Sequence, residues 1–172
     1  AGFVGSNLVM KLLEQDPASI TIVDNLLSSD LSNVSDDRRV SFLYGSIADD
    51  AILAKLPRDL DYVWQLACYH GNQSSIADPI AYQEVNVRGT QNLLELARDR
   101  EVPQFVFAPS SSVSGVNPRV PWSEEDHVLQ PISPYASTKV SGELLGHVYS
   151  HLYGIRFIAL RFFTVYGPRQ RP

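Results

Sequence analysis

The chain has 172 residues, about the length of one domain, and its 44% hydrophobic and 19% charged residues exclude a disordered polypeptide. Its net charge is −5 and no run of Lys or Arg stands out, which argues against nucleic acid and anionic membranes as main partners. No apolar stretch approaches the roughly 18 residues of a spanning helix. The single cysteine excludes an intrachain disulfide, which fits a reducing compartment such as the cytoplasm, or indifference to redox conditions.

The first part of the chain predicts alternating helices and strands. Apolar residues repeat at helical spacing over 3–15, and the apolar run after Asp16-Pro17 predicts a buried strand over 20–24. Residues 25–38 are rich in Ser, Asn and Asp and predict a loop or a short helix. The next predicted elements are, in order, a strand at 40–44, a short helix at 48–56 and a strand at 62–67.

Two longer helices are predicted in the second part, and both have the same start signal. Asp78-Pro79 and Ser133-Pro134 each place a side-chain acceptor at the N-cap and a proline at the first helical position. We expect the first helix to run to Arg98 and the second to about Tyr153. Strands are predicted at 104–108 and 155–163, and residues 111–132 form the longest loop, a length that is usually functional or linking.

Strands that alternate with helices predict an α/β fold with a parallel, doubly wound sheet. The nearly continuous apolar strands agree, because both faces of a parallel sheet are covered. Ligands of such sheets bind outside the carboxyl ends of the strands, so we expect the chemistry among the polar residues that follow each strand. These positions are Asp24-Asn25, Gly45-Ser46, 67–70, 109–112 and 164–166.

A glycine pair and an acid indicate a dinucleotide site. Gly2 and Gly5 frame a helix start, where missing side chains let a pyrophosphate approach backbone N–H groups and the positive helix end. Asp24 comes 19 residues after Gly5 at the end of a strand, which suits an acid that hydrogen-bonds ribose hydroxyls. Asn25 follows it, not Arg or Lys, which favours NAD over NADP. For the glycines alone, the alternative is close helix–strand packing.

A second pattern combines Tyr135, Lys139 and Ser110. Tyr135 and Lys139 stand four residues apart on one predicted helix face. A neighbouring ammonium and the positive nicotinamide of an oxidised cofactor favour the phenolate of a tyrosine, whose pKa is otherwise about 10. Ser110 follows a strand and is placed to bridge a substrate hydroxyl while Tyr135 takes its proton. The alternatives are a solvated aromatic–cation pair and a turn in which serines 110–112 bond the backbone.

Together these motifs resemble the extended short-chain dehydrogenase/reductase family, specifically its NAD-dependent nucleotide-sugar epimerases and dehydratases. The resemblance covers essentially the entire chain, includes the separation of Ser110 from Tyr135, and implies a Rossmann-like fold. The segments that carry it are AGFVGSNL (1–8), IVDNL (22–26), Leu66-Ala67, NVRGTQNLLE (86–95), PSSSVSG (109–115), SPYASTK (133–139) and RFFTVYGP (161–168).

The resemblance implies a role for each matched residue. Tyr135 is the catalytic base, Lys139 holds the nicotinamide ribose and lowers the tyrosine's pKa, and Ser110 bridges the reacting hydroxyl. Asn86 shapes the cofactor side of the site, with a helix-stabilising polar residue as the alternative. NAD is expected to contact Gly2, Phe3, Val4, Gly5, Asp24, Asn25, Leu26, Ser46, Ile47, Leu66, Ala67, Asn86, Tyr135, Lys139, Phe162 and Val165. The nucleotide sugar is expected to contact Ser111, Ser112, Thr164 and Arg171, and no metal site is implied.

The resemblance also narrows the reaction. Ser111 and Ser112 stand where dehydratases of this family carry an acid, so dehydration is disfavoured. What remains is epimerisation, most often at C4: hydride leaves a sugar carbon, the keto sugar rotates, and hydride returns to its other face. The ending with Thr164 and Arg171 resembles the UDP-glucuronate 4-epimerase branch. The alternatives are a dehydrogenase or reductase that releases NADH, a dehydratase, and a non-catalytic NAD-binding module.

Some positions depart from the family pattern. Ser46 stands where an Asp usually contacts adenine, Ser114 replaces a tyrosine, and Tyr69-His70 replace small or polar residues. The chain also begins at Ala1-Gly2 with no strand before it. By resemblance, residues 1–172 are therefore expected to be a partial NAD-binding domain that lacks the first strand and the C-terminal substrate domain and binds NAD poorly alone. The full-length protein is expected to form a homodimer through the two long helices.

Overall fold

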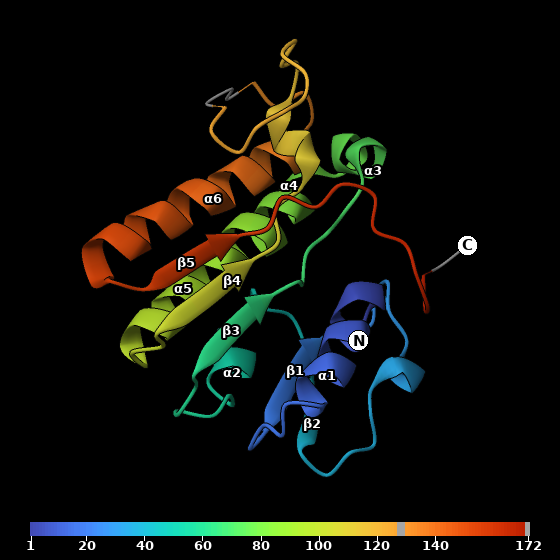
Figure 1. The fold of residues 1–172 in the computed structure, drawn as a ribbon, viewed down its shortest axis with the longest axis vertical. Helices are drawn as coiled ribbons and strands as arrows, with labels where there is room; N and C mark the ends of the chain where they lie inside the picture. Colours follow the sequence, from blue (N-terminus) through green and yellow to red (C-terminus); the bar gives the residue numbers. More distant parts are fainter. Residues whose placement is uncertain (127–129, 171–172) are drawn as a thin grey trace. The chain divides into compact units, whose positions relative to one another are not determined.

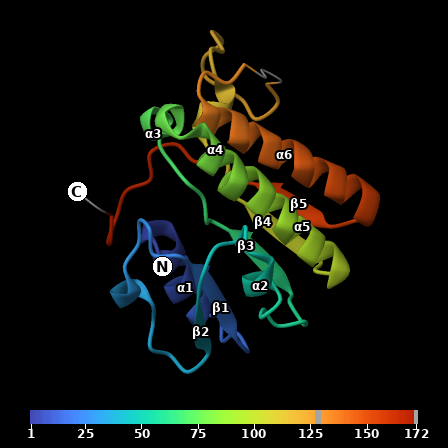
Figure 2. The same ribbon diagram turned by 180° about the vertical axis from the view of Figure 1, so that it is seen from behind.

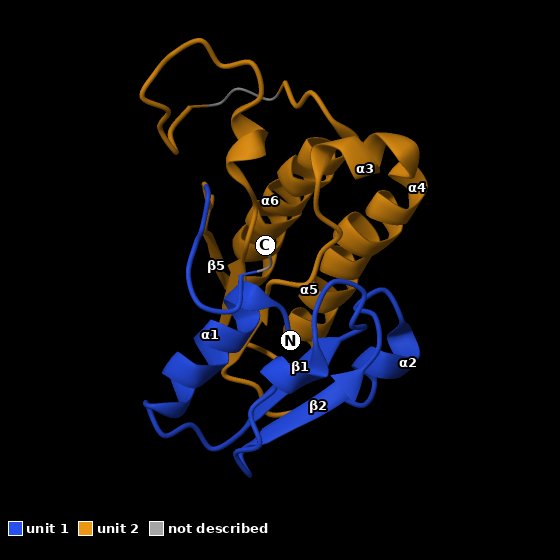
Figure 3. Ribbon diagram, turned by 90° about the vertical axis from the view of Figure 1, so that its right-hand side faces the viewer, with its two compact units in different colours: residues 1–56, 164–172 blue, residues 57–163 orange. Residues whose placement is uncertain are grey.

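The computed structural model describes residues 1–126 and 130–170. The chain divides into two compact units, one of residues 1–56 with 164–172 and one of residues 57–163 (Figure 3). The described strands form a two-stranded sheet, β1-β2, and a three-stranded sheet, β3-β4-β5. Among the described helices, none is long and apolar enough to cross a membrane.

The first unit contains helix α1 (Phe3–Leu13) and the parallel strands β1 (Ile20–Asp24) and β2 (Val40–Tyr44). The two strands run in register from Ile20 opposite Val40 to Asp24 opposite Tyr44, which confirms both predicted strands. The predicted loop or short helix contains the 3₁₀ turn η1 (Leu31–Asn33). The predicted helix at 48–56 is shorter, α2 (Asp50–Leu53), and the Asp49 side chain caps it by accepting from the Ala51 N–H at 2.9 Å.

The second unit contains the parallel strands β3 (Tyr62–Gln65), β4 (Gln104–Phe107) and β5 (Arg156–Ala159) in that spatial order. The prediction of a strand over 155–163 was too long. The ladder ends where Phe107 lies opposite Ala159, because β4 supplies no further partner residues. Beyond it the chain is irregular, and the Phe162 carbonyl instead accepts from the Ser111 N–H at 3.0 Å.

The helices of the second unit confirm both proline-marked starts. The Asp78 side chain caps α4 (Pro79–Tyr82), which continues through a π-helical segment, η2 (Gln83–Arg88), into α5 (Gly89–Asp99). The Ser133 side chain caps α6 (Pro134–Tyr153), which ends at Gly154 in a left-handed conformation with φ +71°. Helix α3 (Asn72–Ala77) was not predicted. Figures 1 and 2 show α5 and α6 side by side.

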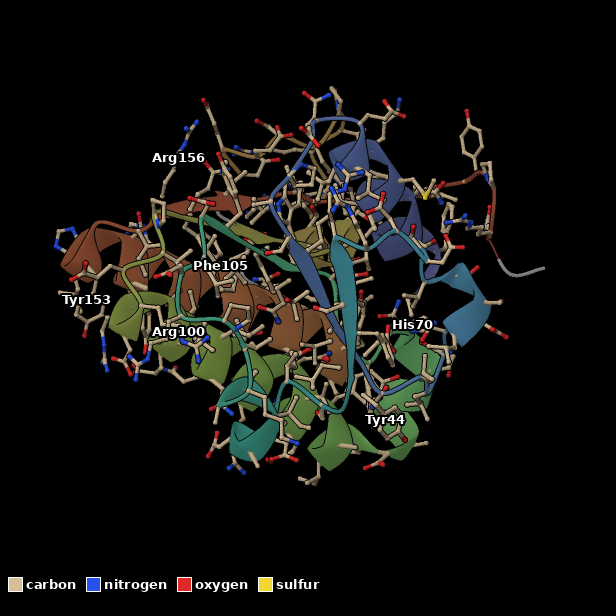
Figure 4. All side chains as sticks on the ribbon, turned by 90° about the horizontal axis from the view of Figure 1, so that it is seen from below. Tyr44, His70, Arg100, Phe105, Tyr153 and Arg156 are labelled. Atoms are coloured by element: carbon tan, nitrogen blue, oxygen red, sulfur yellow. The ribbon has the colours of Figure 1, made fainter. Side chains whose placement is uncertain are left out.

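The core of the second unit lies between its sheet and these two helices. Phe157 stacks against Phe105 and Phe107, with ring centroids 5.8 and 6.0 Å apart, and Phe105 is fully buried. Figure 4 shows Phe105 in the interior, whereas Tyr153 and Arg156 lie at the outer edge of the unit. Glycines in α6 let the helix approach these rings: a Cβ on Gly142 would lie 2.3 Å from Phe107 Cζ, and one on Gly146 2.0 Å from Phe157 Cζ.

Replacing Gly146 by alanine is therefore expected to destabilise the protein. Alanine gains about 1 kcal/mol of helix propensity over glycine, but overpacking a core costs about 1–3 kcal/mol. Because the nearest atoms belong to a ring held between two other rings, we expect a net loss, measured as a lower Tm of the full-length protein. His147→Ala, at an exposed neighbouring position, is the control, and equal Tm values for the two variants would contradict this account.

Candidate active site

The start of α1 in the first unit is open to an anion. Gly2 is the N-cap residue in an extended conformation, and Phe3, Val4 and Gly5 form the first turn. The initial N–H groups of a helix lack intrahelical acceptors, and the helix dipole makes this end positive. A Cβ on Gly2 would meet only Ser29 Cβ, at 4.0 Å, so the glycine leaves space beside the helix end that protein atoms do not fill. This arrangement fits a pyrophosphate.

Asp24 lies at the end of β1 as a well-bonded carboxylate. Its Oδ1 accepts from the Leu26 N–H and the Ser29 hydroxyl, both at 2.8 Å. Burial raises the pKa of this carboxyl, whereas the hydrogen bonds from Ser29 and Leu26 lower it. Asp24 is therefore charged at neutral pH and able to accept from ribose hydroxyls. Ser29 was missed in the sequence because it bonds Asp24 across a loop.

Residues at the other predicted cofactor positions of the first unit are engaged in turns. The Asn25 side chain accepts from the Leu27 N–H at 3.1 Å, and the Ser46 hydroxyl accepts from the Ala48 N–H at 3.2 Å. Ile47, beside Ser46, is buried. Thr164 and Val165 also belong to this unit and are exposed. Arg171 lies outside the described residues.

Tyr135 and Lys139 occupy successive turns at the start of α6, where the Ser133 cap fixes the helix. Lys139 is 3% exposed, and its Nζ donates to the Ala108 carbonyl at 2.8 Å. Its ammonium lies 5.2 Å from the Phe107 ring centroid and 5.9 Å from that of Tyr135. The alternative of a solvated aromatic–cation pair is therefore wrong, because Lys139 is buried. Burying an ammonium is costly unless hydrogen bonds or an opposite charge compensate it.

The Tyr135 phenol lies next to Ser110. The pKa of Tyr135 is raised to about 12: burial raises it most, nearby Cys68 and Tyr82 also raise it, and the hydrogen bond with Ser110 lowers it. The lowering that the tyrosine–lysine spacing predicts is therefore not produced by the protein's side chains alone. Tyr82 also fixes the ring, since the Tyr82 and Tyr135 centroids are 6.3 Å apart in an edge-to-face contact.

The serine cluster after β4 forms a turn and also reaches the tyrosine. Ser110 caps the 3₁₀ turn η3 (Ser111–Ser114): its hydroxyl accepts from the Ser112 N–H at 3.2 Å and lies 3.1 Å from the Ser112 hydroxyl. The serine turn that the sequence offered as an alternative reading is thus present. The same turn positions Ser110 for its bond with Tyr135. Phe162 contributes its backbone carbonyl to the same turn.

Asn86 links the chain segment after β3 to α6. Its Oδ1 accepts from the Tyr69 N–H at 2.7 Å, and its Nδ2 donates to the Tyr69 carbonyl at 2.9 Å and to Thr138 Oγ1 at 3.0 Å. Both amide hydrogens are therefore used within the protein. Asn86 thereby holds the segment that follows Leu66 and Ala67. The partner of Asn86 on α6 is Thr138, which lies between Tyr135 and Lys139 and was not singled out from the sequence.

The chain matches the NAD dependent epimerase/dehydratase family over residues 1–172. It is 37% identical to UDP-glucuronate 4-epimerase 1 of Arabidopsis thaliana, over 99% of this chain and 42% of that protein. Its structure is similar to that of UDP-N-acetylglucosamine 4-epimerase from Methanobrevibacter ruminantium M1 in complex with UDP-N-acetylmuramic acid, with a TM-score of 0.92 and 34% identity over 99% of this chain and 54% of that one.

A dehydratase is equally similar. The dTDP-glucose 4,6-dehydratase DesIV from Streptomyces venezuelae, solved with NAD bound, gives a TM-score of 0.92 and 34% identity over 100% of this chain and 56% of that one. The chain spans about half the length of the curated relatives it matches. The match over its whole length shows that this chain belongs to the NAD-dependent epimerase/dehydratase family.

Proposed function

We propose that the protein containing this chain is an NAD-dependent epimerase that inverts C4 of a nucleotide sugar. The observation that carries the proposal is the cluster of Ser110, Tyr135 and buried Lys139, in which a phenol is held beside a hydroxyl and an ammonium. Such a cluster serves proton transfer to and from a sugar hydroxyl. We assign the chain to the NAD-binding part of that protein, with a substrate domain contributed by further residues.

NAD fits the residues present. Gly2 and the first turn of α1 are assigned to the pyrophosphate, and Asp24 to the hydroxyls of the adenosine ribose. Lys139 is assigned to the nicotinamide ribose, since one donor of its ammonium is fixed by Ala108 and an ammonium has three. When bound, NAD accepts hydride from the sugar carbon and gives it back. We assign the remaining positions of the family pattern to NAD as well. Asn86 contributes indirectly, through its bonds to Tyr69 and Thr138.

The chain's own residues supply the proton transfer. Tyr135 takes the proton of the C4 hydroxyl as hydride leaves C4, and returns it when the keto sugar, turned over, is reduced on its other face. Ser110 bonds both the phenol and the turn at Ser112, so it can hold the reacting oxygen in line. The cation of Lys139 favours the phenolate and, with the cationic nicotinamide, opposes the effect of burial, which raises the pKa of Tyr135.

Epimerisation is favoured over dehydration by the residues that follow Ser110. Elimination of water needs an acid or base beside the neighbouring carbon. By the family pattern that group would stand at position 111 or 112, and both positions are serines, whose hydroxyls do not ionise near neutral pH. UDP-glucuronate is the substrate we favour. The hydroxyls of Ser111, Ser112 and Thr164 and the guanidinium of Arg171 suit a sugar carboxylate or a diphosphate, and UDP-glucuronate 4-epimerases are among the relatives.

The test is to incubate the purified full-length protein with UDP-glucuronate, UDP-glucose and UDP-N-acetylglucosamine and to follow each by proton NMR. We expect a C4 epimer of UDP-glucuronate to form without added cofactor, and NAD to be released when the protein is denatured. Accumulation of reduced nicotinamide during turnover would instead identify a dehydrogenase, and a 4-keto-6-deoxy product would identify a dehydratase. If none of the three nucleotide sugars is converted, the interpretation that remains is a non-catalytic NAD-binding module.

We further expect a homodimer in the cytoplasm. Helix α6 exposes Leu144, Val148 and Leu152, which repeat every four residues on one stripe, with Tyr153 beside them. Such a stripe suits packing against the same helix of a second copy. The thiol of Cys68 is free and half-buried, which is compatible with a reducing compartment.

A further inference from the structure

A chain of buried hydrogen bonds begins on β3 and crosses to α5. Gln65 Nε2 donates to Thr90 Oγ1 at 2.6 Å, and Thr90 Oγ1 in turn donates to the Asn86 carbonyl at 2.5 Å. Asn86 lies in the π-helical segment η2, where carbonyls lose their usual α-helical partners. The Thr90 hydroxyl, at the start of α5, therefore adds a side-chain hydrogen bond to the carbonyl of Asn86 in η2. All three residues are at most 3% exposed.

The chain continues from Asn86 to the turn that carries the tyrosine. Asn86 Nδ2 donates to Thr138 Oγ1 at 3.0 Å, and Thr138 Oγ1 donates to the Tyr135 carbonyl at 2.7 Å. Thr138 is fully buried, and its hydroxyl is both acceptor and donor. The same Asn86 side chain clamps the Tyr69 backbone through two further bonds. One hydroxyl thus joins the first turn of α6 to the segment after β3, about 70 residues earlier in the sequence.

Gln65 gives a second indication that the chain of bonds has a use. Its Oε1 is the one buried side-chain oxygen or nitrogen for which the described part of the protein provides no partner. A buried polar atom without a partner costs free energy, and a leucine of similar size would avoid that cost. The amide is therefore retained at some loss of stability, and the contact that it makes is the bond to Thr90.

We propose that Gln65, Thr90 and Thr138 are positioning residues that act through Asn86 to set Tyr135 against the segment after β3. The proposal rests on the proposed role of Tyr135 as the proton-transferring base. Thr138 is the critical member, because its hydroxyl bonds both Asn86 and the carbonyl of Tyr135 in the first turn of α6. Loss of that hydroxyl leaves an Asn86 N–H buried without an acceptor. Segment η2 and the first turn of α6 then relax independently, and the phenol of Tyr135 moves away from Ser110.

The test compares Thr138→Val with Thr138→Ser in the full-length protein. Valine keeps the shape and removes the hydroxyl, whereas serine keeps the hydroxyl. We expect valine to lower kcat on the order of 10- to 100-fold, as a misplacement of about 1 Å does, to change KM much less, and to shift the acid limb of the kcat profile. Serine should restore both. Ser141→Ala is the matched control, since Ser141 makes a similar bond to the Ser137 carbonyl on the same helix but lies outside the chain of bonds.

Hydrogen exchange gives a readout that does not need a substrate. Thr138→Val should speed exchange both in residues 133–140 and in residues 66–70, and Ser141→Ala should not. If Thr138→Val does not fold, Gln65→Leu replaces it, with an unchanged or higher Tm and faster exchange in 66–70 expected. If the wild-type protein proved inactive but Thr138→Val still sped exchange in both segments, the proposed function would be overturned and the positioning proposal would stand. Equal exchange and equal pH profiles for Thr138→Val and Ser141→Ala would overturn the positioning proposal.

Discussion

Tyr135→Phe is expected to lower kcat by roughly 10²- to 10⁴-fold, the contribution that a positioned general acid–base group makes. Phenylalanine keeps the ring that packs edge-to-face on Tyr82, so folding, NAD content and KM should change little. The loss should therefore lie in the chemical step. The measurement is a steady-state assay of C4 inversion, with NAD quantified after denaturation.

Tyr62→Phe is the matched control, since it removes the hydroxyl of an exposed tyrosine on β3. It should behave like the wild-type protein. If Tyr135→Phe retained most of the activity, Tyr135 would not be the base, and the cluster with Ser110 and Lys139 would have only a structural role.

Lys139→Met is the second change with a large expected effect. Methionine has similar length but no charge, so the Ala108 carbonyl loses this donor and Tyr135 loses the ammonium that lies 5.9 Å from its ring centroid. The base works deprotonated, and the pKa of Tyr135 is raised to about 12, chiefly by burial, even with Lys139 in place. Removing Lys139 raises the pKa of the loaded enzyme's base, so activity should appear only at higher pH, and kcat near neutrality should fall on the order of 10²-fold or more.

The measurement is kcat across the pH range in which both proteins stay folded, together with the amount of NAD retained on purification. We expect the acid limb of the profile to move to higher pH and NAD retention to fall. Lys55→Met, at an exposed lysine, should leave both unchanged. An unshifted profile in Lys139→Met would show that the ammonium does not favour the phenolate.

Local signals in the sequence were enough for most of the fold. Ser133-Pro134 predicted the start of α6, and the strand at 40–44 was predicted at its observed bounds. The length of β5 was not predictable in this way, because its mostly apolar segment continues to Phe163, whereas the ladder with β4 ends at Ala159. Helix α3 was missed because its polar residues show no apolar period.

The candidate site was predictable as a set of residue types but not as a set of contacts. The spacing of Tyr135 and Lys139 placed them on one helix face, and the position of Ser110 after β4 brought it to the same region. That Lys139 is buried against the Ala108 carbonyl depends on packing between distant segments. The link from Asn86 to Thr138 likewise depends on η2, a change of helical period that the apolar pattern does not reveal.

The most direct test uses UDP-glucuronate carrying deuterium at C4 and the purified full-length protein with its own bound NAD. Reversible hydride transfer at one carbon predicts a product that is inverted at C4 and still carries deuterium there, with no net reduction of the cofactor. Deuterium that accumulates in reduced nicotinamide, or that is lost to water while C4 inverts, would contradict the account.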